Sequence, residues 1–176
     1  WDKDPLRIGC PNGVMDLGSG TLVIGHPREF IRKSVFARWD HRFDAWIQTG
    51  KGDSPCPKFE NFVSEMLYGD VLVSAFLQKY FGVGLSGRGD LQSVLFMYGP
   101  QGGNGKSDLL KAIQYTMGGI CMPIDKEVLY DSKRAHASSA NGHKAHILNI
   151  MHKHLCIVSE ANENHFLGST FRQLTG

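Results

Sequence analysis

The fold is indicated by one stretch, Val94-Leu95-Phe96-Met97-Tyr98-Gly99-Pro100-Gln101-Gly102-Gly103-Asn104-Gly105-Lys106-Ser107. The apolar run 94–98 predicts a strand that is buried on both faces of a parallel sheet. Residues 106–117 have the pattern of an amphipathic helix, and Gly118-Gly119 predicts its end. A strand, a glycine-rich loop and a helix in this order are typical of a phosphate-binding loop.

The loop Gly99–Ser107 has the residue types that phosphate binding requires. Glycines let backbone N–H groups approach a phosphate without a Cβ in the way, and the helix N-terminus adds the positive end of its dipole. Lys106 can reach the β- and γ-phosphates, and the Ser107 hydroxyl can ligate Mg²⁺. The predicted cofactors are therefore ATP and Mg²⁺. The predicted nucleotide-binding residues are Gly99, Gly102, Gly103, Asn104, Gly105, Lys106 and Ser107.

The spacing of the loop departs from the strict motif. Pro100 occupies the position where that motif has its first glycine, so the loop from Gly99 is one residue longer. Asp108 also places a negative charge near the expected phosphates.

A P-loop ATPase also needs an acidic residue at the end of a neighbouring strand. The run Leu155-Cys156-Ile157-Val158 predicts a second buried strand, and Glu160 follows it at the edge where open α/β sheets bind ligands. We expect Glu160 to help hold the metal and to orient the attacking water, with Glu163 as a weaker second acid. Ser159 occupies the position where many P-loop enzymes have a metal-binding Asp.

The rest of the chain predicts a small mixed domain before the ATPase domain. Residues 10–24 have the pattern of strand, turn and strand, and an apolar face at helical spacing begins at Phe59. Asp70 is a candidate N-cap for a second helix, which should end among the glycines at 82–89. We therefore expect an α/β chain: a β-hairpin and helical domain over 1–88 and a partial, parallel-sheet P-loop ATPase domain over 89–176.

Composition excludes several classes of protein. Apolar residues make up 41% and charged residues 20%, as in a folded globular domain, and the formal net charge of +2 allows a nucleic-acid partner without arguing for one. No apolar stretch approaches the length of a membrane span, and the first residues lack the features of a signal peptide. The four cysteines form no CxxC pair, which favours free thiols, and the absence of an initial Met suggests a segment of a longer chain.

Several motifs in order resemble the superfamily-three helicase region of primase-helicases from poxviruses, phages and plasmids. The matching segments are Asn12–Gly20, the helical residues 59–87, Met97–Ser107, Val158-Ser159-Glu160 and Phe171–Gly176. The resemblance covers nearly the whole chain. It implies an AAA+-like ATPase fold and an ATP-driven DNA helicase or translocase that works as a ring, expected to be a homo-hexamer.

The resemblance also implies roles for particular residues and for partners. Lys106 and Glu160 would be the catalytic residues, and Ser107 and Glu160 the metal-binding ones. Arg172 replaces the lysine of the family's third motif, which is linked to the DNA-facing hairpin. A primase domain is expected upstream of Trp1, and a sensor Asn and an arginine finger beyond Gly176, so that this segment alone would bind ATP with little turnover. The expected location is the cytoplasm of an infected or host cell.

Two alternatives remain at the level of the sequence. A small-molecule kinase should carry several arginines in a lid after the core, whereas residues 123–142 contain only Arg134. A non-catalytic assembly or DNA-binding module with a vestigial nucleotide site is the second alternative, and the long loop, Asp108 and Ser159 are the features that favour it.

Overall fold

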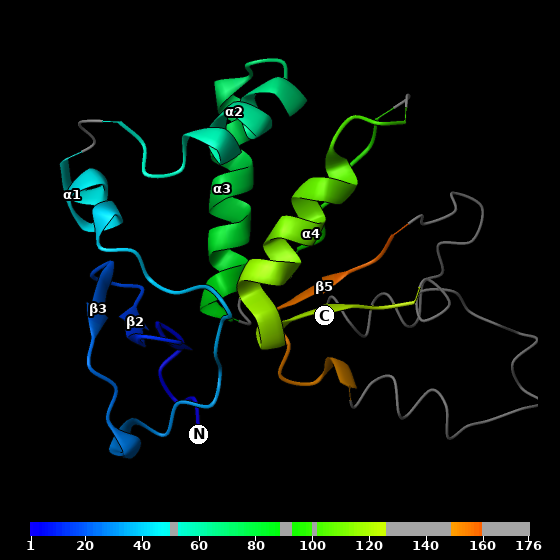
Figure 1. Ribbon diagram of the computed structural model, residues 1–176. Helices are drawn as coiled ribbons and strands as arrows, with labels where there is room; N and C mark the ends of the chain where they lie inside the picture. The colour runs from blue at the N-terminus through cyan, green and yellow to red at the C-terminus, as the bar shows by residue number, and fades with distance from the viewer. Residues whose placement is uncertain (50–52, 89–92, 100–101, 126–148, 160–176) are drawn as a thin grey trace, which may run out of the picture.

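The computed structural model describes residues 1–49, 53–88, 93–99, 102–125 and 149–159 (Figure 1). These residues form a mixed α/β structure with a three-stranded antiparallel sheet and a two-stranded parallel sheet. The antiparallel strands are β1 (Arg7–Cys10), β2 (Gly13–Asp16) and β3 (Thr21–Val23), and the parallel strands are β4 (Cys121–Pro123) and β5 (Leu155–Ile157). The helices are α1 (Arg42–Thr49), α2 (Pro57–Met66), α3 (Val71–Ser86) and α4 (Lys106–Met117), with short 3-10 helices η1 (Pro27–Glu29) and η2 (Gly118–Ile120).

The predicted N-terminal hairpin is confirmed as β2 and β3, which pair with Val14 opposite Val23. Its turn is held by the Asp16 carboxylate, which accepts hydrogen bonds from the backbone N–H groups of Gly18 at 2.9 Å and Ser19 at 3.1 Å. Strand β1 adds a third member that was not predicted. It buries Ile8, which is only 1% exposed, and it connects the sheet to the rest of the core.

Helices α2 and α3 lie where the apolar spacing places them. Pro57 stands in the first turn of α2, where its missing N–H costs nothing. Asp70 caps α3, and its Oδ1 accepts from Leu72 N at 2.9 Å and Val73 N at 3.0 Å. Helix α3 runs past Gly82 and Gly84 and ends at Gly87, whose φ of +63° favours glycine.

The expectation of a buried strand at residues 94–98 is wrong. The segment is not part of a sheet, and the side chains of Val94, Phe96 and Tyr98 are exposed, whereas Leu95 and Met97 between them are half-buried. A central strand of a parallel sheet pairs with a neighbour along each edge and has helices over both faces. In the part of the chain that the structure describes, the parallel sheet consists of β4 and β5, and residues 94–98 pair with neither of them.

The two parallel strands lie against the C-terminal end of α4. Strand β4 follows α4 through η2 and pairs with β5, with Cys121 opposite Leu155 (Figure 1). Strand β5 and the helix over 106–117 are confirmed, whereas β4 was not predicted. In the sequence, these three residues cannot be distinguished from the mixed region that follows them.

One hydrophobic core joins the two halves of the chain. Its buried members are Ile8, Val35, Met117, Ile120, Cys121 and Ile157, and Leu85 of α3 packs against them. The core therefore draws residues from both sides of the expected boundary at 88/89, which remains a prediction.

The cysteines are free thiols, as the sequence predicts. All four cysteines are free, and burial raises the pKa of the Cys121 thiol to about 11, which keeps it protonated and unreactive at neutral pH. No described helix is long and apolar enough to cross a membrane.

Candidate nucleotide-binding site

The glycine-rich loop leads into the N-terminus of α4 through two glycines in the left-handed region. Gly103 and Gly105 both have φ of +77°, and Gly105 is the N-cap of α4. A side chain at either position would be strained. The first turn of an α-helix has N–H groups without intrahelical partners, so the loop ends at a group of free donors at the positive end of the helix dipole.

The structure brings Gly99, Asn104 and Lys106 together at the mouth of the loop. The Lys106 ammonium donates a hydrogen bond of 2.5 Å to Asn104 Oδ1. A Cβ added to Gly99 would lie 2.7 Å from Lys106 Nζ and 2.1 Å from Asn104 Nδ2. The lysine side chain therefore folds back over the start of the loop, and a side chain at position 99 would displace the ends of Lys106 and Asn104.

Gly102, Gly103 and Ser107 face open space. A Cβ on Gly102 or Gly103 would meet no atom within 4 Å, and the Ser107 side chain is exposed. Asp108 is exposed as well, and its carboxylate lies 3.9 Å from Lys111 Nζ one turn along α4. The lysine offsets the negative charge that Asp108 brings near the loop. Residues 100 and 101, including Pro100, lie outside the described part of the loop.

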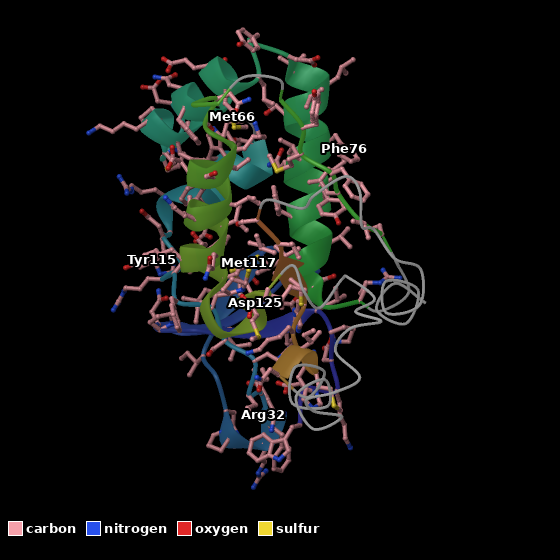
Figure 2. The ribbon with its side chains drawn as sticks, turned by 90° about the vertical axis from the view of Figure 1, so that its right-hand side faces the viewer. Arg32, Met66, Phe76, Tyr115, Met117 and Asp125 are labelled. Atoms are coloured by element: carbon pink, nitrogen blue, oxygen red, sulfur yellow. The ribbon has the colours of Figure 1, made fainter. Side chains whose placement is uncertain are left out.

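Helix α2 packs against the end of the loop at Gly105, a contact that the sequence does not predict. A Cβ on Gly105 would lie 3.2 Å from Phe62 Cε2 and 3.3 Å from Met66 Cγ. Figure 2 shows Met66 at the end of the molecule where α4 begins. The i, i+4 spacing of Phe62 and Met66 marks an apolar face, but no local pattern says which partner that face covers.

The described residues end one position before Glu160, the expected acidic partner of the loop. Strand β5 ends at Ile157 and leads to an exposed Ser159. Glu160, Glu163 and Arg172 lie outside the described residues, so their roles remain predictions. Because β4 and β5 are parallel, their carboxyl ends meet at one edge of the sheet, the edge at which Glu160 follows.

His154 was not predicted, and it joins α3 to the parallel sheet. Its Nδ1 lies 3.0 Å from the Leu85 carbonyl oxygen, and its backbone N–H donates to Ile120 O at 2.8 Å. Its Nε2 is buried without a hydrogen-bond partner among the described residues. Burial lowers the pKa of His154, as does nearby Lys33, while the Leu85 hydrogen bond and Asp2 raise it.

Acidification should therefore destabilise the protein through His154. The ordinary histidine pKa is 6.5, and the pKa of His154 in the folded chain lies below it. Below that pH the unfolded chain takes up a proton that the folded chain does not, so the free energy of unfolding falls until the folded pKa is reached. In urea unfolding at about pH 7.5 and about pH 5.5, His154→Gln should lose less stability on acidification than the wild type.

The control for this measurement is Gln78→Ala, a change at an exposed position of α3 that does not titrate. It should leave the difference between the two pH values as it is in the wild type. An unchanged difference in His154→Gln would contradict the assignment.

The chain is similar to one protein family and to one viral protein. Residues 1–68 match the family described as D5 N terminal like. The chain is also similar to a protein of Acanthamoeba polyphaga mimivirus named "Putative helicase L207/L206", with 28% identity over 140 residues, or 80% of this chain. A match of that length necessarily includes the phosphate loop, whichever end it starts from. The chain spans 14% of the length of that relative.

Proposed function

We propose that this chain is the nucleotide-binding part of an ATP-dependent DNA helicase or translocase and that Gly99–Ser107 holds Mg-ATP. The observation that carries the proposal is the Lys106 ammonium folded over Gly99 at the N-terminus of α4. The similarity of the chain to a viral protein named as a helicase supports DNA unwinding as the use of the nucleotide. The match of residues 1–68 to the D5 N terminal like family also supports this proposed function.

The residues of the loop fit a triphosphate by their donors and their charge. Free N–H groups at the start of α4 and the Lys106 ammonium offer donors to phosphate oxygens. Lys106 would exchange its bond to Asn104 for the β- and γ-phosphates, so Asn104 holds the ammonium in place beforehand. Ser107 would hold the Mg²⁺ ion, which neutralises charge on the phosphates when bound. Glu160 would orient the attacking water.

The larger assembly is part of the same proposal. An ATP-driven motor would act on single-stranded or forked DNA as a homo-hexameric ring, with Arg172 near the DNA and a primase domain upstream in the same chain. A ring would complete each site with an arginine from the neighbouring subunit, and such a residue contributes about 10³–10⁵ in rate in P-loop enzymes. The proposed location is the cytoplasm of an infected or host cell, where viral replication would use it.

Loss of the loop lysine should weaken nucleotide binding. In isothermal titration with Mg-ATP, Lys106→Ala should bind at least about tenfold more weakly than the wild type, because a charge-assisted contact to two phosphates is lost. Lys79→Ala removes the same charge from an exposed position on α3, away from the loop, and should bind like the wild type. Equal binding by Lys106→Ala and the wild type would refute the loop assignment and would leave the non-catalytic module as the better reading.

A further inference from the structure

A second cavity, of about 250 Å³, lies away from the phosphate loop. It is lined by Asp2, Arg32, Lys33, Ser34, Gly119, Ile120, His152 and Lys153. Figure 2 shows Arg32 at the opposite end of the molecule from Met66, which packs beneath the phosphate loop. The cavity is thus separate from the proposed ATP site, and it is formed where the N-terminal part of the chain meets the segment before β5.

Asp2 builds one wall of this cavity. Its Oδ1 accepts hydrogen bonds from the backbone N–H groups of Arg32 at 2.7 Å and Lys33 at 2.9 Å. The backbone of Lys33 is fixed in turn by Gly9 of β1, whose N–H donates to the Lys33 carbonyl at 2.9 Å. The two basic residues are therefore carried on a backbone that is attached to the core, and Asp2 is their structural support.

The lining has an excess of positive charge. Arg32, Lys33 and Lys153 face a single carboxylate, that of Asp2, and this local excess equals the formal net charge of +2 of the whole chain. The contacts leave these cations poorly neutralised. Arg32 Nε lies 3.9 Å from Asp2 Oδ2 with a side chain 59% exposed, and the described residues provide no ion pair for the Lys33 ammonium.

The opposite wall holds its own cation in place. Lys153 Nζ donates to the Gly119 carbonyl at 2.7 Å, so its charge is fixed beside η2 without being neutralised. Next to it, the exposed His152 has φ of +69°, a conformation that non-glycine residues adopt rarely and that occurs more often at functional sites. Each wall of the cavity thus presents positive charge from a fixed backbone.

We propose that this cavity binds the phosphodiester backbone of a single-stranded nucleic acid. The volume is below the range of pockets that enclose a whole small molecule, which favours one phosphate group of a longer chain. Arginine and lysine donors suit contacts to phosphate without sequence preference. The inference rests on the proposed function for its choice of nucleic acid over free phosphate.

The test is the salt dependence of DNA binding by the complete chain. Anisotropy of a fluorescein-labelled oligothymidylate is measured at about 50 to 200 mM salt for the wild type and for the double variant Arg32→Gln/Lys33→Gln. Each phosphate that is no longer contacted lowers the slope of log K against log salt by about 0.7 for single strands. Because the cavity holds one phosphate group, the double variant should lose roughly 0.7 in slope and about tenfold or more in affinity. Asp2→Asn keeps the acceptor oxygen and removes the negative charge, and should bind more tightly than the wild type.

The matched control is Lys58→Gln/Lys79→Gln, which removes two exposed charges from α2 and α3 outside the cavity and should change neither quantity. Equal losses in the two double variants would overturn the proposal, as would an unchanged Arg32→Gln/Lys33→Gln protein. Competition by inorganic phosphate at concentrations equal in ionic strength to the salt series would identify a free-phosphate site instead.

The outcomes also separate this inference from the proposed function. Absence of DNA binding in a wild type that binds Mg-ATP through Lys106 would overturn the inference and leave the proposed nucleotide site standing. The opposite outcome is a wild type that binds DNA but not Mg-ATP, with DNA binding lost in the Arg32→Gln/Lys33→Gln variant. That result would refute the nucleotide site and support the cavity.

Discussion

Ile8→Ala is expected to lower the free energy of unfolding by about 3 kcal/mol. Ile8 is 1% exposed, the largest fully buried side chain among the described residues, and it packs in the core cluster with Val35, Met117 and Ile157. Removing three carbon atoms from such a site loses their transfer free energy and leaves a cavity that neighbours fill only partly. For a chain of this size the melting temperature should fall by about 6–12 °C, measured by circular dichroism.

Ile24→Ala is the matched control, because the same change is made in the same sheet region at a side chain that is 95% exposed. It should shift the melting temperature by no more than about 2 °C, since exposed substitutions change stability by about 0.5 kcal/mol or less. Ile8→Val should give an intermediate loss of about 1 kcal/mol and keeps the measurement possible if the alanine variant does not fold. A loss in Ile8→Ala no larger than that in Ile24→Ala would contradict this account of the core.

The elements that depend on local signals can be predicted from the sequence. Helix α3 is identified by the Asp70 cap and helix α4 by the glycines before it and after it, and both signals act within one turn of the residues concerned. The hairpin of β2 and β3 is predicted in the same way by its turn. The conformation of these residues is determined by residues close to them in the chain.

Pairing between distant segments cannot be predicted in this way. The apolar run 94–98 has the composition of a central strand, yet whether it is buried depends on distant segments that must pair with its edges and cover its faces. In the described residues β4 pairs with β5 instead, and Phe96 is 63% exposed. Strand β4 itself has too few residues to show a period, so only its partner identifies it.

The candidate site also has one part that the sequence predicts and another that it does not. The chemistry of Gly105, Lys106 and Ser107 follows from their order in the chain, because the loop and the helix N-terminus are one continuous segment. The packing of Phe62 and Met66 beneath Gly105 joins positions about 40 residues apart and depends on how α2 meets α4. The sequence therefore predicts which groups bind a phosphate, while the structure is needed to show what supports them.

Gly87→Ala is expected to cost about 2–5 kcal/mol of stability, for two separable reasons. Gly87 has φ of +63°, where an alanine is strained by about 1–2 kcal/mol. A Cβ there would also lie 2.3 Å from Cε1 of His154. The hydrogen-bond contact of His154 Nδ1 with the Leu85 carbonyl holds the ring in place, so relief requires breaking that contact or shifting α3 away from β5.

Two further glycines separate the strain from the clash. Gly20 and Gly69 have φ of +69° and +76° with no atom within 4 Å of an added Cβ, so alanine at either position should cost only the backbone term. The double variant Gly87→Ala/His154→Ala removes the clashing ring and should be less destabilised by the Gly87 change than the wild-type background is, which a double-mutant cycle in urea measures. Additive losses in that cycle would show that the contact does not act as described.

The same experiment tests whether the two halves of the chain unfold together. Gly87 lies before the expected boundary at 88/89 and His154 beyond it, and the core cluster also crosses that boundary. If both halves form one cooperative unit, Gly87→Ala should move a single unfolding transition, seen at the same urea concentration by circular dichroism and by tryptophan fluorescence from Trp39 and Trp46 of the N-terminal half. Transitions that separate in the variant would instead place the cooperative boundary at this contact, as two domains over 1–88 and 89–176 require.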